Sequence, residues 1–175
     1  MIVVTGGAGF IGSNLSAALL DRGYHVRAVD NFSQGNELNI AALLPHPSFT
    51  LHRLDVCNQA AMEEASAGAS AIVHLAAYKI PRYGDALDTL TINAMGSMSV
   101  ANAARRHGAK LVAASTSDVY GKNPVLPFTE ESDLVIGSPY VRRWAYAISK
   151  MYGEQLLLAM HERYGIDVVL LRFFG

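Results

Sequence analysis

The feature that most constrains the fold is a short apolar run followed at once by closely spaced glycines. Residues 2–5 (IVVT) have the composition of a buried strand, and the segment Thr5–Gly12 (TGGAGFIG) leads into a helical pattern that ends near Asp21-Arg22-Gly23. Closely spaced glycines let the backbone turn sharply between a strand and a helix. The chain is therefore expected to open with a strand, a tight turn and a helix.

The same alternation of short apolar runs and longer helical stretches continues along the chain. Further strands are expected at His25–Asp30, Phe49–Asp55, Ala71–Ala76, Lys110–Ser115 and Ile166–Phe173, and long helices at about Asp85–His107 and Trp144–Tyr164. Alternation of this kind implies right-handed crossovers and a parallel sheet covered on both faces. The predicted fold is α/β, a doubly wound parallel sheet. The remaining long stretch, from Tyr120 to Arg143, is expected to be a functional loop, because structureless loops of that length are uncommon.

Composition excludes several classes of function. With 51% hydrophobic residues the chain can bury a core, and a net charge of −1 gives no support for nucleic-acid binding. Cys57 is the single cysteine, which excludes an internal disulfide and a multi-cysteine metal site. His74 stands within an apolar run and is expected to be a core histidine rather than a ligand. We expect a cytoplasmic protein with no metal, nucleic-acid or membrane partner.

The glycine-rich turn and the acid that follows it predict a dinucleotide site. Glycines let the backbone approach a pyrophosphate, whose charge then lies at the helix N-terminus. Asp30 ends the second expected strand, 18 residues after Gly12. A carboxylate there accepts hydrogen bonds from ribose hydroxyls and repels a 2′-phosphate, so the expected cofactor is NAD rather than NADP. Asp55-Val56, where the third strand ends, either borders the adenine or places Asp55 as a helix cap.

A tyrosine and a lysine four residues apart form a candidate catalytic pair. Tyr146 and Lys150 (YAISK) share one face of the expected helix. An ammonium near a phenol lowers the tyrosine pKa from about 10 toward the working pH, which predicts Tyr146 as a general base toward a sugar hydroxyl. Thr116, after the fifth strand, adds a hydroxyl to this network. Taken alone, such a pair is more typical of a solvated helix face.

Taken together, these motifs resemble the extended short-chain dehydrogenase/reductase family, and within it the nucleotide-sugar epimerases, dehydratases and decarboxylases. The matching segments are Thr5–Gly12, Asp30-Asn31, Asp55-Val56, His74-Leu75-Ala76-Ala77, Asn93, Ser115-Thr116-Ser117-Asp118-Val119-Tyr120-Gly121, Tyr146 with Lys150, and Leu171-Arg172-Phe173-Phe174. They occur in the family's order along the whole chain.

The resemblance implies a role for each matching residue. The catalytic residues would be Thr116, Tyr146 and Lys150. The NAD-binding residues would be Gly6, Gly9 and Gly12 with the amides of Phe10 and Ile11 at the pyrophosphate, Asp30, Asn31 and Ser33 at the adenosine, Asp55 and Val56 at the adenine, Leu75, Ala76 and Ala77 at the nicotinamide half, and Lys79, Asn93, Tyr146 and Lys150 elsewhere along the cofactor. It further implies that residues 1–175 form the NAD-binding Rossmann domain, and that the C-terminal substrate-binding part is absent from this chain.

The resemblance also implies chemistry through a 4-keto sugar intermediate. The 4,6-dehydratases carry Asp-Glu directly after the active-site threonine, whereas this chain has Ser117-Asp118, a pattern more similar to enzymes of UDP-uronic acids. The expected function is an NAD-dependent UDP-hexose or UDP-uronate 4-epimerase. The alternatives are a UDP-glucuronate decarboxylase, an NDP-sugar 4,6-dehydratase, or an NAD-binding fragment without turnover. Arg142 and Arg143 either bind a carboxylate or diphosphate or are solvated.

The expected partners are a nucleotide-sugar substrate, UDP-linked, and a second copy of the chain. Apolar residues recur near helical spacing in the helix Asp85–His107, at Leu87, Leu90, Met95, Met98 and Ala101. This stripe is interpreted first as core. Because family members often dimerise through this helix and the Tyr146 helix, part of the stripe is an alternative candidate for a homodimer interface.

Overall fold

The computed structural model describes residues 1–79 and 85–174. Six parallel strands form one sheet in the order β3-β2-β1-β4-β5-β6, with β1 at Ile2–Thr5, β2 at Val26–Asp30, β3 at Phe49–Arg53, β4 at Ala71–His74, β5 at Lys110–Thr116 and β6 at Val168–Phe173. The strand order reverses between β1 and β4, which are hydrogen-bonded neighbours. This order is that of the doubly wound dinucleotide-binding fold, so the predicted Rossmann architecture is confirmed.

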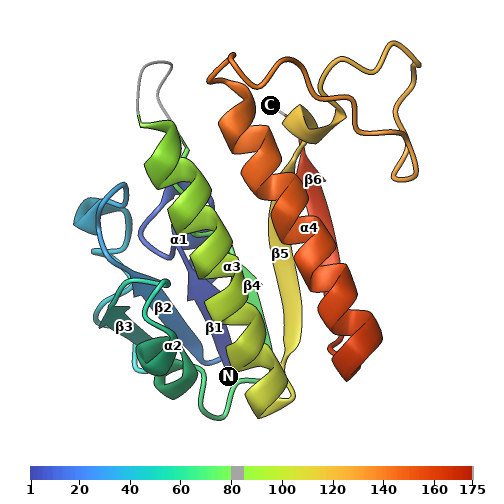
Figure 1. Cartoon of the computed structure of the whole chain (residues 1–175). Coiled ribbons are helices and arrows are strands. Elements are labelled where there is room, and N and C mark those ends of the chain that lie inside the picture. The colour runs from blue at the N-terminus through green and yellow to red at the C-terminus, as the bar shows by residue number, and fades with distance from the viewer. Residues whose placement is uncertain (80–84, 175) are drawn as a thin grey trace.

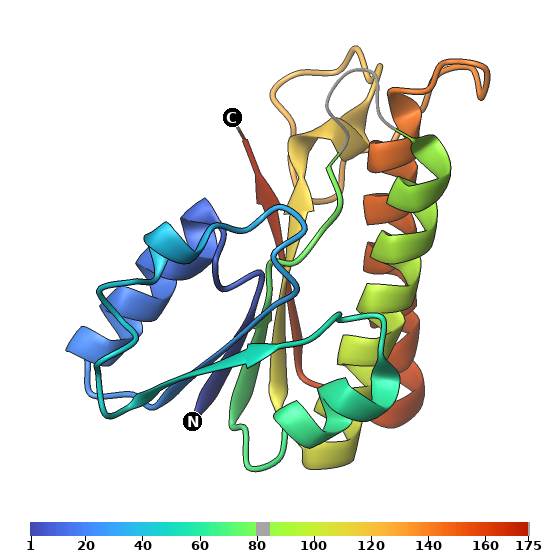
Figure 2. The same ribbon diagram turned by 90° about the vertical axis from the view of Figure 1, so that its left-hand side faces the viewer.

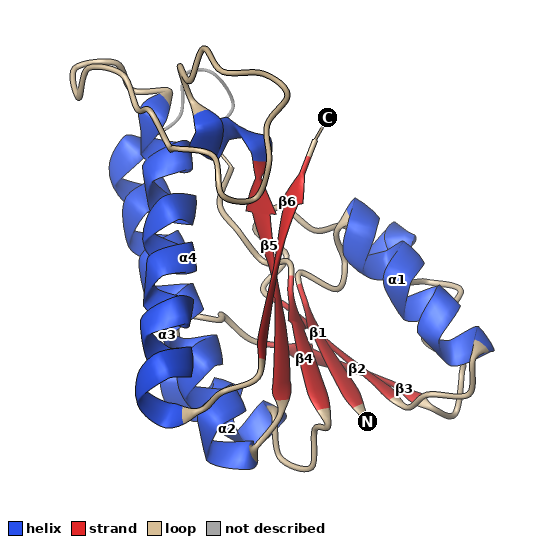
Figure 3. Ribbon diagram, turned by 90° about the vertical axis from the view of Figure 1, so that its right-hand side faces the viewer, coloured by secondary structure: helices blue, strands red, loops and turns tan. Residues whose placement is uncertain are grey.

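Helices cover the sheet on both faces, as predicted. Helix α1 (Phe10–Asp21) lies on one face, and α2 (Gln59–Ala65), α3 (Ala86–His107) and α4 (Trp144–Tyr164) lie on the other (Figures 1 and 3). Two short 3-10 turns, η1 (Glu37–Asn39) and η2 (Ser117–Tyr120), complete the elements. No helix in the part of the chain that the structure describes is long and apolar enough to cross a membrane.

Local chemistry explains where the two long helices begin and end. The carboxylate of Asp85 accepts the Leu87 amide and caps the start of α3. Gly108 and Gly165 follow α3 and α4 in the left-handed conformation, with φ of 63° and 69°, which glycine adopts without a steric penalty. These signals stand in the sequence, and both helices match their predicted ranges to within a residue.

Each face of the sheet has its own buried core. On the α2–α4 side the core includes Ile72, Leu111, Val100 and Leu157, all at most 2% exposed. On the α1 side it is built from a smaller set: Val4, Ala8, Leu20, Val26, Ala28, Ile40 and Phe49. Parallel strands are stable when apolar residues are buried on both faces, which accounts for two cores in a chain of this length.

The face that α1 covers is only partly shielded toward β6. Along β6, Leu170 packs against the α4-side core. Because side chains alternate along a strand, Leu171 and Phe173, one and three residues further on, point to the opposite face. Their side chains are 39% and 42% exposed. Figure 2 shows α1 beside β1 and β2, away from the edge strand β6. The sheet therefore presents apolar side chains on this face at its β6 edge.

Some predicted boundaries were wrong. β4 ends at His74 rather than Ala76, because the Ala76 amide bonds the Thr5 hydroxyl instead of continuing the ladder. β3 ends at Arg53, two residues before Asp55. No range was predicted for helix α2, since its seven residues are too few for a clear apolar period. The stretch between Tyr120 and Arg143 is irregular, as predicted, although Tyr120 itself closes η2.

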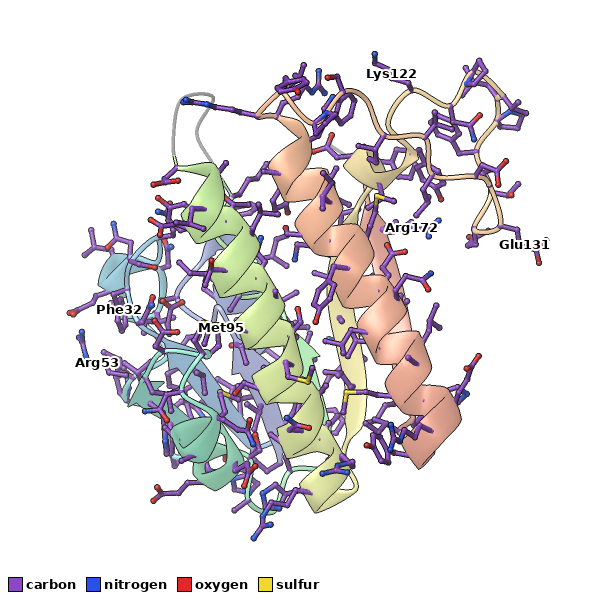
Figure 4. All side chains as sticks on the ribbon, in the orientation of Figure 1. Phe32, Arg53, Met95, Lys122, Glu131 and Arg172 are labelled. Atoms are coloured by element: carbon purple, nitrogen blue, oxygen red, sulfur yellow. The ribbon has the colours of Figure 1, made fainter. Side chains whose placement is uncertain are left out.

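The core interpretation of the α3 stripe holds only for part of it. Ala101 is fully buried and Met98 packs against the α2–α4 core. Leu87, Leu90 and Met95 are 68%, 37% and 51% exposed, so for them the core interpretation was wrong; Met95 is labelled in Figure 4. These three side chains are exposed because α4 and the sheet contact other sides of α3.

A substitution at Gly12, in the turn after β1, tests how closely the backbone packs there. A Cβ on Gly12 would lie 2.2 Å from the Gly6 carbonyl oxygen, so Gly12→Ala must displace backbone. We expect it to lower the free energy of unfolding by about 1–3 kcal/mol, measured by urea denaturation. Gly153→Ala is the matched control, since its Cβ meets only Ser97 Oγ at 3.4 Å. Equal stability of Gly12→Ala and the wild type would contradict this packing.

Candidate active site

The segment between β1 and α1 is a tight turn whose glycines contact backbone on several sides. Gly6 has a φ of 70°, and a Cβ there would lie 2.8 Å from the Ala76 nitrogen. Helix α1 then begins at the N-cap Gly9 with no side-chain cap. The first amides of a helix have no intrahelical partner, and together with the helix dipole they attract an anion. The turn has the shape and polarity that a pyrophosphate requires.

Asp30 holds this turn in place from the end of β2. Its carboxylate accepts the Ala8 amide at 2.9 Å and the Phe32 amide at 2.8 Å, and the residue is 7% exposed. The second bond supports Phe32 at a φ of 60°, a conformation uncommon for a bulky residue. The Asp30 carboxylate thus has a structural role in addition to the ribose contact predicted from sequence.

A cavity of about 370 Å³ lies beside the turn, over the carboxyl ends of β1, β2, β3 and β4. Asn31 donates to the Asp55 carboxylate at 2.9 Å across this cavity's edge. Asp55 also accepts the Cys57 amide, whereas the cap of α2 is Asn58, so the alternative of Asp55 as a helix cap was wrong. The predicted residues that line the cavity are Gly6, Gly9, Asp30, Asn31, Ser33, Asp55, Val56, Leu75, Ala76 and Ala77.

A second cavity, of about 520 Å³, adjoins the first and holds the candidate catalytic residues. The two share four lining residues, Gly6, Gly9, Leu75 and Ala77, so they meet over the glycine turn. Its other predicted lining residues are Phe10, Ile11, Gly12, Lys79, Thr116, Tyr146 and Lys150. Residues far apart in sequence are thus brought to one edge of the sheet, where ligands bind in folds of this kind.

Thr116, Tyr146 and Lys150 reach this cavity from two elements. Thr116 ends β5, and its Oγ1 accepts the Asp118 amide at 3.2 Å, which leaves the hydroxyl hydrogen free to donate. Tyr146 and Lys150 lie on α4, with Lys150 Nζ 5.9 Å from the centre of the Tyr146 ring. Lys79, in the segment after β4, has its Nζ 5.6 Å from the centre of the same ring.

The expected lowering of the Tyr146 pKa is not found. Burial, and after it the Asp118 carboxylate, raise the pKa of Tyr146 above its ordinary value, so the phenol is protonated at neutral pH. Lys150 donates its Nζ hydrogen bond to the Ala114 carbonyl at 2.9 Å. Burial lowers the pKa of Lys150 to about 8, against an opposing effect of Glu154. The prediction from sequence failed because it did not account for burial or for Asp118.

His74 is a satisfied core histidine, as expected. It is 4% exposed, and its Nδ1 shares a 2.8 Å hydrogen bond with the hydroxyl of Thr5. Burial, and in second place the charge of Lys150, lower the pKa of His74 to about 3, so the ring is neutral. Among residues 1–79 and 85–174, no cluster of three or more His, Cys, Asp or Glu side chains is arranged to hold a metal ion.

Asn93 is the predicted site residue that the structure does not bring into either cavity. Its amide oxygen accepts the Tyr78 amide at 2.7 Å, and its nitrogen donates to the Tyr78 carbonyl and to the Ser149 hydroxyl. Asn93 therefore links α3 to the segment after β4 and to α4, one residue before Lys150. Its place indicates support of the cavity wall rather than contact with a ligand.

Several lining residues were not predicted. Those that line the larger cavity are Ala114, Ser115, Ser117, Asp118, Phe173 and Phe174. Gly35 lies against the Asp30 carboxylate, and a Cβ on Gly35 would be 2.8 Å from Asp30 Oδ1. Glu154, buried four residues after Lys150, was also missed. The spacing Tyr-x-x-x-Lys-x-x-x-Glu was a usable signal, since it places all three on one helix face.

The residues present fit a nicotinamide dinucleotide. An uncapped helix N-terminus at a glycine turn suits the pyrophosphate, a carboxylate at the end of β2 suits ribose hydroxyls, and two adjoining cavities provide room for the two halves. The second cavity adds a phenol, a hydroxyl and an ammonium at one wall. This set can move a proton at an oxygen of a small substrate.

Comparison with known proteins gives relatives of three activities. The chain is 35% identical to UDP-glucuronic acid decarboxylase 1 of Arabidopsis thaliana over 99% of its own length and 39% of the relative. It superposes on UDP-N-acetylglucosamine 4-epimerase from Methanobrevibacter ruminantium with a TM-score of 0.89 at 32% identity, covering 99% of this chain and 54% of that one. For a double mutant of DesIV, a dTDP-glucose 4,6-dehydratase from Streptomyces venezuelae, with NAD bound, the TM-score is 0.88 at 30% identity, covering 98% of this chain and 55% of that one.

The chain spans about half the length, or less, of the curated relatives it matches. Over residues 2–175 it matches the family described as NAD dependent epimerase/dehydratase family, whose cofactor is the one that the turn and both cavities fit. With fold, cofactor site and sequence in agreement, the chain belongs to the NAD-dependent epimerase/dehydratase family.

Proposed function

We propose that this chain is the NAD-binding and catalytic part of a nucleotide-sugar 4-epimerase that acts through a 4-keto intermediate on a UDP-linked hexose or uronate. The observation that carries the proposal is the meeting of Thr116, Tyr146 and Lys150 at one wall of the cavity that adjoins the glycine turn. A phenol, a hydroxyl and an ammonium beside a dinucleotide site are the groups that oxidation of a sugar hydroxyl requires.

The side chains divide the chemistry between them. Tyr146 accepts the proton of the C4 hydroxyl as the general base and returns it when the ketone is reduced. Thr116, whose oxygen already accepts the Asp118 amide, donates its hydrogen bond to the same substrate oxygen. When bound, NAD⁺ supplies the hydride acceptor and a positive charge that favours the phenolate. Lys150 contributes a second positive charge from within α4.

The rest of the site holds and selects the cofactor. Asp30 and Asn31 bind the adenosine ribose, with Ser33 beside them, and the Asp30 carboxylate repels a 2′-phosphate, which favours NAD over NADP. The amides of Phe10 and Ile11 meet the pyrophosphate at the start of α1. Asp55 and Val56 border the adenine, and Leu75, Ala76 and Ala77 with Lys79 line the nicotinamide half.

The acid after Thr116 separates the candidate reactions. A dehydratase needs an acid–base pair for loss of water across C5 and C6, and this chain has Ser117 where the first acid of that pair would stand. The named relatives include decarboxylases, dehydratases and an epimerase. UDP-glucuronate decarboxylase is the second candidate, favoured by the Thr-Ser-acid pattern at residues 116–118, whose Asp118 lines the same cavity as Tyr146. Arg143, exposed and 4.9 Å over the Trp144 ring, does not separate the two.

The reaction is decided by product analysis. We expect the enzyme of which this chain is the NAD-binding and catalytic part to convert UDP-glucuronate into UDP-galacturonate or UDP-glucose into UDP-galactose in the presence of NAD⁺, with the products identified by NMR. UDP-xylose with release of CO₂ would establish the decarboxylase instead, and a 4-keto-6-deoxy product the dehydratase. Isothermal titration tests the remaining class, because binding of NAD⁺ without any UDP-sugar would show an NAD-binding fragment without turnover.

Loss of the phenol oxygen should stop the chemistry and spare cofactor binding. Tyr146→Phe keeps the ring but removes the acid–base group, so we expect turnover to fall by at least about 100-fold while NAD⁺ affinity, measured by titration calorimetry, stays within a few-fold. Tyr24→Phe is the matched control, since Tyr24 is half-exposed and lines neither cavity. Near-normal turnover by Tyr146→Phe would remove this residue from the mechanism.

A second copy of the chain is the proposed partner. Leu87 and Leu90 on α3 and Ile148 and Tyr152 on α4 are all more than 36% exposed, and α3 packs beside α4 (Figure 1). Exposed apolar side chains gathered on adjacent helices are typical of an interface. We expect analytical ultracentrifugation at micromolar concentrations to show a dimer, and Leu87→Gln/Leu90→Gln to shift it to monomer. A wild type that sediments only as monomer would contradict the dimer.

A further inference from the structure

Glu154 is a buried carboxylate that the proposed chemistry does not use. It is 4% exposed on α4, four residues after Lys150, so the two side chains lie on one face of the helix. A buried carboxylate is strongly destabilising unless it is paired and hydrogen-bonded. Its contacts therefore indicate what it stabilises.

The carboxylate bonds two strands of the sheet at once. Ser115, which immediately precedes Thr116 at the end of β5, donates its hydroxyl to Glu154 Oε1. Arg172, near the end of β6, donates from Nε to Oε1 at 3.0 Å and from Nη2 to Oε2 at 2.6 Å. This two-pronged geometry is the strongest form of an arginine–carboxylate pair. Glu154 thus fixes α4 against the ends of β5 and β6.

The same guanidinium extends the connection to the loop that precedes α4. Arg172 Nη1 donates to the Tyr120 hydroxyl and to the Glu130 carbonyl, each at 3.1 Å (Figure 4 labels Arg172). Tyr120 in turn donates to the Thr129 carbonyl and stacks on Phe128 at 4.5 Å between ring centres. The end of β5, the loop and α4 are therefore anchored by one ion pair, between the buried Glu154 and the partly buried Arg172.

The negative charge of Glu154 also acts on Lys150. The two residues line the same small internal cavity, together with His74 and Ser115. His74, from β4, lines this cavity in its neutral form, and on α4 the centre of the Tyr146 ring lies 5.9 Å from the Lys150 ammonium. Glu154 is the negative group in this set. Its carboxylate opposes the effect of burial on Lys150.

We propose that Glu154 is a positioning residue of the active site, which holds Thr116 against α4 through Ser115 and Arg172 and supplies a negative charge in the small cavity that it lines with the buried Lys150. The consequence for catalysis rests on the proposed function, whereas the contacts with Ser115 and Arg172 and the cavity shared with Lys150 do not. The proposal is therefore testable by a measurement that needs no turnover.

Titration of Lys150 tests the charge. The chain has four lysines, Lys79, Lys110, Lys122 and Lys150, so protein labelled with ¹³C at lysine Cε gives few signals, and Lys150→Arg assigns the one of interest. In Glu154→Gln we expect the Lys150 midpoint to fall by about one pH unit, because the carboxylate no longer favours the ammonium. The matched control Glu162→Gln removes an exposed carboxylate of the same helix and should leave the midpoint unchanged. An unchanged midpoint in folded Glu154→Gln overturns the charge role.

Hydrogen exchange tests the positioning, and remains available if Glu154→Gln does not fold. Glu154→Asp keeps the charge but withdraws the carboxylate by one methylene from Ser115 and Arg172. We expect the amides of Thr116 and Ser117 to exchange about tenfold faster in this variant, with the Lys150 midpoint retained. Exchange at wild-type rates would overturn the positioning role. An enzyme that contains this chain and shows no turnover of any nucleotide sugar would contradict the proposed function and leave both of these results unaffected.

Discussion

The structure depends on the close approach of backbones around the glycine turn. A Cβ on Gly6 would lie 2.8 Å from the Ala76 nitrogen, one on Gly7 would lie 2.6 Å from the Ala28 side chain, and one on Gly12 would lie 2.2 Å from the Gly6 carbonyl. These three contacts fix β4, β2 and α1 around the end of β1. A side chain at any of these three glycines would occupy the space that the neighbouring backbone or side chain fills. The turn that shapes the cofactor site is therefore also what allows the central strands to pack.

Two buried carboxylates extend this framework to either side. Asp30 ties the turn to the segment after β2 through the Ala8 and Phe32 amides. Glu154 ties α4 to β5 and β6 through Ser115 and Arg172. The two cavities lie between these anchors, above the point where the strand order reverses. A fully bonded buried carboxylate is rigid, so the residues around it are held in one arrangement.

The electrostatics of the catalytic wall are a balance of opposing effects. Burial and Asp118 raise the Tyr146 pKa, whereas burial lowers that of Lys150 and Glu154 opposes the change. A positive charge added beside the phenol shifts this balance toward phenolate. A positively charged cofactor bound beside the phenol would therefore favour the phenolate, which suits the general-base role proposed for Tyr146.

The sequence by itself determined the parallel sheet, the two long helices and most of the residues that line the two cavities, because apolar period, glycine spacing and helix caps are local signals. Only the tertiary structure decided which groups the polar side chains bond and which of them face a cavity. Asn93 supports a wall rather than facing a cavity, Asp30 bonds backbone, and Glu154 anchors two strands. It also decided that Leu87 and Met95 are exposed and that the Tyr146 pKa rises. Burial and the partner of a polar atom depend on segments distant in sequence, and no local pattern records them.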